Sequence, residues 1–128
     1  MRERVIHAAW LYPELMNVYA DRGNVIALRA RCEAYGIGCE LTRVELGDPL
    51  PDAADLVLIG GGQDREQWRV APDLVRHAGR LRDWVEEDAA VLAVCGGFQL
   101  FGHWYRTARG EELPGAAVFD VTTVAPPP

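Results

Sequence analysis

Short segments dense in apolar residues recur along the chain and alternate with longer segments in which apolar residues keep helical spacing. The short segments cover residues 5–10, 39–46, 55–59 and 91–94. The runs at 55–59 and 91–94 have little polar alternation, which is typical of strands that are buried in a parallel sheet. Residues 118–122 favour a further strand. The pattern therefore predicts a mainly parallel sheet.

Two longer segments predict helices. The first runs from about residue 25 to residue 35, with Asn24 as its N-cap and Gly36 as its stop. The second begins near Pro72, because proline is normal in the first turn of a helix. His77 falls on the charged, solvated side of this second helix. The apolar faces consist of Val25, Leu28, Cys32 and Tyr35 in the first helix, and of Leu74, Val75, Ala78, Leu81 and Val85 in the second.

Strands that alternate with helices of about ten to fifteen residues indicate parallel strands joined by crossovers. We therefore expect an α/β fold, a three-layer sandwich with a mainly parallel sheet of flavodoxin-like type. A chain of 128 residues is one domain by its length. In such sheets ligands bind outside the carboxyl ends of the strands, so a functional site is expected in the turns that follow them.

The turn after the strand at 91–94 carries the strongest chemical signal. Cys95 ends the strand, Gly96 and Gly97 follow, and an apolar helical pattern continues through Trp104. A nucleophile between a strand and a helix is the nucleophile-elbow arrangement. The glycines permit the sharp turn, and the N–H groups at the start of the helix favour the thiolate form of Cys95. The alternative is a buried cysteine that only packs.

A second turn, made of the three glycines 60–62, follows the buried strand at 55–59. It matches neither the Walker phosphate loop nor the G-x-G-x-x-G fingerprint. Glycines let backbone N–H groups approach a ligand closely. If Cys95 attacks a carbonyl carbon, the resulting oxyanion needs N–H donors. Gly96 can supply one donor and the triple-glycine turn the other, so the two turns together predict attack of a thiolate on a carbonyl group.

Composition and charge narrow the class of partner. Hydrophobic residues make up 49% of the chain and charged residues 25%, which excludes general disorder. The net charge of -6 and the lack of a basic stripe argue against nucleic acid as a partner. No apolar run is long enough to span a membrane, and the start of the chain lacks a signal-peptide core. Three cysteines without metal-ligand spacing predict no metal site and a reducing, cytoplasmic location.

Further motifs lie between residues 5 and 122. They are Leu11-Tyr12-Pro13, Leu15-Met16-Asn17, Tyr19, Asp21-Arg22-Gly23-Asn24, Ile59-Gly60-Gly61-Gly62-Gln63-Asp64-Arg65-Glu66-Gln67 and Cys95-Gly96-Gly97-Phe98-Gln99. Together they resemble the cobyric-acid-synthase-like branch of the class I glutamine amidotransferases. Within that branch they are most similar to the glutaminase subunits of lipid II isoglutaminyl synthases.

The resemblance implies hydrolysis of L-glutamine through a cysteinyl thioester. The site residues that it implies are Cys95 as the nucleophile, Gly61 and Gly96 as the oxyanion donors, and Gln99, Gly60 and Gly62 as substrate-binding residues. The released ammonia would pass to a Mur-ligase-like synthetase subunit in a heterodimer, which would amidate the D-glutamate of the lipid II stem peptide. ATP and Mg²⁺ would bind to that partner, and no cofactor is expected in this subunit.

Family members are longer, and the resemblance places their general-base histidine beyond the similar region. His103 lies eight residues after Cys95 on the same predicted helix. That is about 12 Å along the helix axis, too far for proton transfer. His7 lies within the first strand, and His77 lies on an outer helix face. We therefore expect residues 1–128 to form the N-terminal part of a single glutamine amidotransferase domain, truncated or degenerate, with little activity alone.

Three other functions stay open. The same turn motifs occur in glutaminase segments that serve cobyrinic or cobyric acid amidation. A non-catalytic subunit that docks on a ligase would keep the elbow as a relic. A stress-type cysteine protein of the same broad fold would oxidise Cys95 without recognising glutamine. Labelling by a glutamine-analogue electrophile distinguishes a glutaminase from the two functions without glutamine hydrolysis, because only a nucleophile in a glutamine site reacts faster than Cys32 and Cys39.

Overall fold

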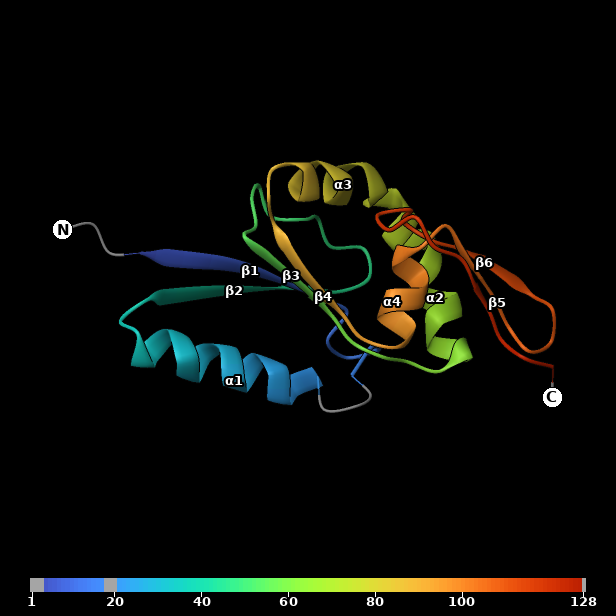
Figure 1. The fold of residues 1–128 in the computed structure, drawn as a ribbon, viewed down its shortest axis with the longest axis horizontal. Coiled ribbons are helices and arrows are strands. Elements are labelled where there is room, and N and C mark those ends of the chain that lie inside the picture. The colour runs from blue at the N-terminus through green and yellow to red at the C-terminus, as the bar shows by residue number, and fades with distance from the viewer. Residues whose placement is uncertain (1–3, 18–20, 128) are drawn as a thin grey trace.

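The main sheet of the protein has four parallel strands in the order β2-β1-β3-β4 (Figure 1). A computed structural model describes residues 4–17 and 21–127; residues 1–3 at the chain start and Tyr19 of the motifs lie outside these ranges. The order and the parallel pairing are those of a flavodoxin-like sheet, which confirms the predicted fold class. The strands are β1 (Val5–Leu11), β2 (Gly38–Val44), β3 (Leu56–Ile59) and β4 (Ala90–Ala93).

Helices cover the two faces of this sheet in separate layers (Figure 1). On one face lies α1 (Asp21–Ala34), and on the other lie α2 (Asp64–Arg76), α3 (Ala78–Glu86) and α4 (Gly96–Phe101). Successive strand residues point to opposite faces, so Leu58 packs toward α1 and Ile59 toward α2 and α4. The prediction of three layers is confirmed. No helix among the described residues has the length and apolar character needed to cross a membrane.

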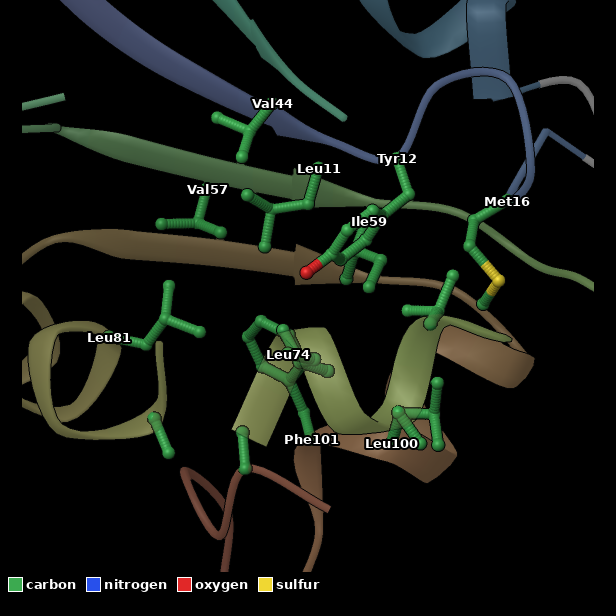
Figure 2. Packing of buried hydrophobic residues seen from close by; sticks show 14 of the residues in the cluster. Leu11, Tyr12, Met16, Val44, Val57, Ile59, Leu74, Leu81, Leu100 and Phe101 are labelled. Carbon is green, nitrogen blue, oxygen red and sulfur yellow. The ribbon is translucent and has the colours of Figure 1, made fainter. Parts of the chain in front are cut away.

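The larger core fills the space between the sheet and the layer of α2, α3 and α4 (Figure 2). Its central side chains are Leu11, Val57 and Ile59 from the strands, and Leu74, Leu81, Leu100 and Phe101 from the helices. Each of them is at most 2% exposed, and full burial of one such side chain contributes about 1.5–3 kcal/mol. This core fixes α2 and α4 relative to the strand ends where the two glycine-containing turns begin.

The first helix begins earlier than the sequence predicts. α1 starts at Asp21, so Asn24 lies inside the helix and is not its N-cap. Val25 and Cys32 are buried as predicted. Tyr35 is 72% exposed, because it follows the last helical residue and leaves the apolar face. The predicted apolar face is therefore correct within the helix and wrong at its end.

Gly36 ends α1 as predicted. Its φ is +67°, a conformation that glycine adopts at no steric cost. Its N–H donates to the carbonyl of Glu33 at 3.1 Å, and the N–H of Ile37 donates to the carbonyl of Cys32 at 2.8 Å. These two bonds form a Schellman motif, which satisfies the last carbonyls of the helix.

The second predicted helix is two helices. α2 starts at Asp64 and not near Pro72, which lies inside it. Proline lacks the N–H that an interior helical residue donates, and α2 ends soon afterwards at Arg76. α3 begins after His77, whose carbonyl accepts a hydrogen bond from the N–H of Leu81 at 3.0 Å. Residues 64–71, which precede the predicted start of this helix, are therefore helical as well.

The break at His77 also changes which side chains face the core. Val75 is 38% exposed and Val85 is only partly buried, whereas Trp84 is buried. His77 is 7% exposed, so the prediction that it is solvated is wrong. The periodicity fails here because two short helices with a break between them do not share one continuous face. The members of the predicted face that are buried are Leu74, Ala78 and Leu81.

A second sheet of three strands follows α4. β5 (Trp104–Arg106) pairs antiparallel with β6 (Glu112–Pro114) and parallel with β7 (Thr123–Val124). The predicted helix through Trp104 is wrong, because α4 ends at Phe101. The predicted strand at 118–122 is also wrong, because β7 begins after it. These strands have two or three residues each, too few for alternation to identify them.

β4, the strand that leads to Cys95, lies at the edge of the main sheet. Within the described residues it pairs with β3 alone. Leu92 is 43% exposed, whereas Val91 and Ala93 pack against the larger core. The strand that carries the predicted nucleophile therefore presents a row of backbone groups and one large apolar side chain outward.

Candidate active site

Cys95 lies at the sharp turn between β4 and α4. Its φ is 51° and its ψ is -113°. Positive φ is uncommon for a non-glycine residue, and such strained conformations cluster at functional sites. The N–H of Gly97 closes the turn by donating to the carbonyl of Val94 at 2.9 Å, and the N–H of Gln99 donates to the carbonyl of Cys95 at 3.0 Å. Cys95 is exposed, which excludes a cysteine that is only buried in the core.

The triple-glycine turn lies directly against this elbow, backbone to backbone. A Cβ atom on Gly97 would be 2.6 Å from the carbonyl oxygen of Gly60 and 2.9 Å from that of Ile59. A Cβ atom on Gly96 would be 2.9 Å from the carbonyl oxygen of Gly62. Such distances are well inside van der Waals contact, so a side chain at residue 97 would push the two strand ends apart. The structure thus brings together the two turns that the sequence places at one edge of the sheet.

Two backbone amides of these turns are the predicted oxyanion donors. Within the described residues no hydrogen bond engages the N–H of Gly96, as expected in the first turn of a helix. Gly61 is buried between Gly60 and Gly62, next to the end of β3. Both amides belong to turns that contact each other, and their role as oxyanion donors stays a prediction.

The loop after β1 supports the triple-glycine turn from a third side. Met16 is fully buried, and a Cβ atom on Gly62 would be 2.6 Å from its sulfur. The same Cβ atom would be 3.3 Å from the carbonyl oxygen of Leu15. The N–H of Met16 donates to the carbonyl of Tyr12 at 2.8 Å, which closes the loop. Motif residues far from Cys95 in the sequence therefore shape the same site.

Gln67 on α2 joins the two turns; the resemblance places residues 63–67 near the mouth of the site, but the sequence assigns Gln67 no role. Its side-chain nitrogen Nε2 donates to the carbonyl of Gly62 at 2.9 Å and to Oε1 of Gln99 at 3.2 Å. Gln67 is 2% exposed. A glutamine usually indicates surface, so composition gave no signal for it. Gln99, predicted to bind substrate, is held by this contact, and its role toward substrate stays a prediction.

Tyr105 on β5 is a second residue that the sequence analysis missed. Its hydroxyl donates to Oδ1 of Asp64 at 2.9 Å. Burial, then the hydrogen bond to Asp64, and also the proximity of Cys95 raise the pKa of Tyr105 to about 12. The phenol is therefore neutral at physiological pH and lies near the nucleophile. Asp64 also lines a cavity of about 620 Å³, which includes Trp68 and lies between α2 and the turn from β5 to β6.

Two of the three histidines lie away from Cys95. His7 has its Nδ1 3.0 Å from Oε2 of Glu40. The strand register places His7 about six residues below the level of Cys95, or about 20 Å. His103 lies beyond α4 and not on it as predicted, with its Nε2 2.8 Å from Oδ1 of Asp120. Among the described residues no three His, Cys, Asp or Glu side chains come together in a way that could hold a metal ion.

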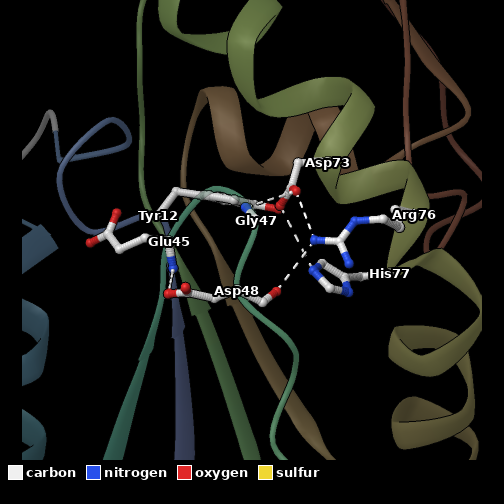
Figure 3. Close-up of polar contacts among 7 residues, drawn as sticks. All are labelled: Tyr12, Glu45, Gly47, Asp48, Asp73, Arg76 and His77. Atoms are coloured by element: carbon white, nitrogen blue, oxygen red, sulfur yellow. Dashed lines mark hydrogen bonds and ion pairs between the residues drawn. The ribbon is translucent and has the colours of Figure 1, made fainter.

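The third histidine, His77, belongs to a polar cluster at the other end of α2 (Figure 3). Its Nε2 lies 3.7 Å from Oδ2 of Asp73. Asp73 accepts hydrogen bonds from the hydroxyl of Tyr12 at 2.6 Å, from the N–H of Gly47 at 3.1 Å and from the guanidinium of Arg76 at 2.8 Å. This carboxylate therefore joins the loops after β1 and β2 to the last turn of α2.

The cluster shifts the pKa values of its own members. Burial opposes ionisation of Asp73, but hydrogen bonds from Tyr12, Arg76 and Gly47 outweigh it and hold the pKa of Asp73 below its usual value. Burial, followed by the hydrogen bond to Asp73, raises the pKa of Tyr12 well above its usual value. Burial lowers the pKa of His77, and the charge of Arg76 lowers it further. At neutral pH the cluster therefore holds a carboxylate, a neutral phenol and a neutral imidazole.

The sequence is similar to one family of known domains. The profile of the CobB/CobQ-like glutamine amidotransferase domain matches residues 7–127. Subunit GatD of lipid II isoglutaminyl synthase (glutamine-hydrolyzing) from Streptococcus pneumoniae is 38% identical over 88% of this chain, and GatD from Staphylococcus aureus is 35% identical over 84%. Cobyric acid synthase from Methylobacterium nodulans is 33% identical over 70% of this chain.

The similar region is only part of each relative. It covers 44% of GatD from Streptococcus pneumoniae, 45% of GatD from Staphylococcus aureus and 19% of the cobyric acid synthase. The chain therefore spans less than half the length of these relatives. Both turns of the candidate site lie inside the range that the family profile matches.

Proposed function

Because the chain belongs to the family of CobB/CobQ-like glutamine amidotransferase domains, we propose that it supplies the nucleophile and the oxyanion donors of a glutaminase. One observation carries this proposal: Cys95 is exposed at a strained elbow whose glycines contact the triple-glycine turn. Such a backbone conformation costs about 1–3 kcal/mol, which packing alone does not explain. An exposed thiol between backbone amides is suited to attack on a carbonyl group.

In the proposed reaction the thiolate of Cys95 attacks the carboxamide carbon of L-glutamine. A carbon–sulfur bond forms, and the carbonyl π electrons move to the oxygen, which accepts hydrogen bonds from the N–H groups of Gly96 and Gly61. The carbon–nitrogen bond then breaks, and the nitrogen takes a proton and leaves as ammonia. Water hydrolyses the thioester to glutamate and restores the thiol.

The proton transfers in this reaction need a general base beside Cys95. The three histidines face carboxylates elsewhere, namely Glu40, Asp73 and Asp120. In this proposal the base comes from a segment or subunit outside residues 1–128. We therefore expect this chain alone to release glutamate from L-glutamine very slowly, measured with a coupled glutamate assay. Turnover at the rate of an ordinary enzyme would contradict this assignment of the base.

The ammonia acceptor and the partner are proposed from the relatives. Two of them are subunits of lipid II isoglutaminyl synthase by name, so we propose amidation of the D-glutamate of lipid II. The proposed partner is a Mur-ligase-like synthetase subunit that binds ATP and Mg²⁺, with no cofactor in this chain. The free thiols of Cys32, Cys39 and Cys95 support a reducing, cytoplasmic location.

Amidation of cobyrinic or cobyric acid is the second candidate, and similarity to a cobyric acid synthase favours it. That similarity is weaker, at 33% identity over 70% of the chain compared with 38% over 88%. Lipid II is therefore the better supported acceptor.

A diazoketone analogue of L-glutamine tests the glutaminase proposal. It carries an electrophilic carbon near the position of the carboxamide, so a nucleophile in a glutamine site is alkylated quickly. We expect Cys95 to be labelled at least about tenfold faster than Cys32 or Cys39, as follows from selective thiolate reactivity. We also expect L-glutamine to slow the labelling of Cys95. Peptide mass spectrometry identifies the labelled cysteine.

Cys39 is a suitable internal control for this experiment. Burial, followed by the neighbouring thiol of Cys32, raises the pKa of Cys39, so less of it is thiolate at neutral pH. A Cys95→Ser variant checks that the fast label is on Cys95. Equal labelling of the three cysteines, or no protection by L-glutamine, would refute the proposed function.

A further inference from the structure

The reaction proposed above gives no role to the side chain that connects its two turns. Gln67 is 2% exposed and lies on the first turns of α2. A primary amide has two N–H donors, and Gln67 uses both, one on the carbonyl of Gly62 and one on Oε1 of Gln99. One bond therefore reaches the triple-glycine turn and the other reaches the helix that begins at the elbow.

We propose that Gln67 is a positioning residue, which sets the spacing between the triple-glycine turn and the elbow and fixes which end of the Gln99 amide is free for the substrate. A Cβ atom on Gly96 would be 2.6 Å from Nε2 of Gln67 and 2.9 Å from the carbonyl oxygen of Gly62. The amide nitrogen of Gln67 thus packs directly against the residue whose N–H is the predicted oxyanion donor. The proposed role of Gln67 in spacing the two turns is argued from geometry alone. Its proposed role toward the substrate rests on the proposed glutaminase function.

The contact with Gln99 decides the polarity of a ligand that binds there. Because Oε1 of Gln99 accepts from Gln67, the free end of the Gln99 amide is its NH₂ group. A ligand at this position meets a hydrogen-bond donor and must offer an acceptor, such as a carbonyl or carboxylate oxygen of L-glutamine. Without Gln67 the Gln99 amide is free to rotate and present its oxygen, which repels such a ligand.

Stability alone does not explain an amide at position 67. Oε1 of Gln67 is buried and has no hydrogen-bond partner in the described part of the chain. An unpaired buried oxygen is unfavourable for folding. A methionine of similar volume would remove this oxygen, so the benefit of glutamine lies in the two bonds that its nitrogen donates.

Two variants and one matched control test the proposed role of Gln67. Gln67→Met keeps the volume and removes both donated bonds together with the unpaired oxygen. Gln67→Glu keeps the shape and places carboxylate oxygens opposite two acceptors. Gln63→Met is the control, because Gln63 is the exposed N-cap of the same helix and its side chain makes no cap hydrogen bond.

The first measurement does not depend on any ligand. Backbone hydrogen exchange at residues 60–62 and 96–99 is expected to be about tenfold faster in Gln67→Met, the factor for one lost hydrogen bond. A cooperative unfolding transition of Gln67→Met in urea shows that the variant folds. Unchanged exchange in both segments would overturn the proposed spacing role.

The second measurement uses the diazoketone analogue of L-glutamine. Alkylation of Cys95 is expected to be about tenfold slower in Gln67→Met, which is the factor for the loss of one hydrogen bond. It is expected to be slower still in Gln67→Glu. Labelling of Cys95 by methyl methanethiosulfonate, which has no carboxamide and no amino-acid group, is expected to stay within about twofold in every variant. Gln63→Met is expected to react like the wild type with both reagents.

The two measurements separate the two proposals. If the analogue labels wild-type Cys95 no faster than Cys39, the glutaminase function is refuted together with the role of Gln67 toward substrate. The exchange measurement then still decides the spacing role. If the analogue labels wild-type Cys95 quickly and Gln67→Met reacts equally fast, the glutaminase function stands and the positioning of Gln99 by Gln67 is refuted.

Discussion

The two ends of α2 are attached to the sheet in opposite ways. Beside its first turns, the elbow glycines at the start of α4 lie against carbonyl oxygens of Gly60 and Gly62, a contact made by backbone. At its last turn the contacts are made by side chains, with Asp73 bonded to Tyr12 and Arg76 (Figure 3). One end of α2 therefore lies at a backbone contact that a single buried side chain, Gln67, connects, and the other end carries a cluster of several polar side chains.

The difference shows which end is available for chemistry. The backbone end leaves the sulfur of Cys95 exposed and the N–H of Gly96 without a partner among the described residues. At the other end, the polar groups of Tyr12 and Asp73 mainly satisfy each other, and little is left to bind a ligand. The first end is suited to a reaction and the second to holding loops in place.

One added methyl group at the backbone end should have the largest effect. Gly97→Ala places a Cβ atom 2.6 Å from the carbonyl oxygen of Gly60, and neither backbone can yield without moving a strand end. We expect the free energy of unfolding to fall by about 3 kcal/mol, measured in urea.

Gly79→Ala in α3 is the matched control, because a Cβ atom there has nothing within 4 Å. Alanine is favoured over glycine inside a helix by up to about 1 kcal/mol, so this variant should be more stable than the wild type. If Gly97→Ala and Gly79→Ala unfold alike, the close backbone contact is not what holds the elbow.

Loss of one hydroxyl at the side-chain end should have an intermediate effect. Tyr12→Phe removes the hydrogen bond to Oδ2 of Asp73 at 2.6 Å. Bonds to a charged group contribute about 1.5–3 kcal/mol, so we expect a loss of about 2 kcal/mol in the free energy of unfolding. Tyr35→Phe serves as the control, because Tyr35 is largely exposed. Equal stability of the two variants would show that the cluster does not anchor the loop after β1.

A change of pH should have the smallest effect, and it acts on the side-chain end through His77. Because burial lowers the pKa of folded His77, the unfolded chain binds a proton more readily below about pH 6.5. The free energy of unfolding should therefore fall as the pH drops below that value, with a slope of at most about 1.4 kcal/mol per pH unit from this residue. His77→Gln should have a shallower slope in urea titrations between pH 7 and pH 5. Identical slopes would mean that His77 does not titrate differently in the folded protein.

The fold and the elbow could be predicted because their signals are local. β3 and β4 are short apolar runs; Gly60 follows β3 directly, and Cys95 lies two residues after the end of β4. Parallel strands share one carboxyl edge, so the topology alone places the two turns side by side. No long-range contact had to be known for this part of the site.

The remaining residues could not be predicted, because their roles depend on contacts far apart in the sequence. Proline is typical of the first turn of a helix, but Pro72 lies inside α2. A helical periodicity that starts at Pro72 therefore assigns the wrong residues to the buried face. His77 was therefore placed on the surface and Gln67 outside the helix. The bond between Tyr12 and Asp73 joins residues 61 positions apart, and no periodicity indicates it.

Because β4 lies at the edge of the main sheet, a strand that paired with it would also lie beside the exposed sulfur of Cys95. Among the described residues no strand pairs with the outer side of β4. Leu92 on β4 is exposed, three residues before Cys95. A peptide that adds as a fifth strand at this edge would therefore also cover the thiol. If two copies of the chain pair along this edge, accessibility of the thiol falls as the protein concentration rises, and labelling rates of variants are then comparable only at equal concentration.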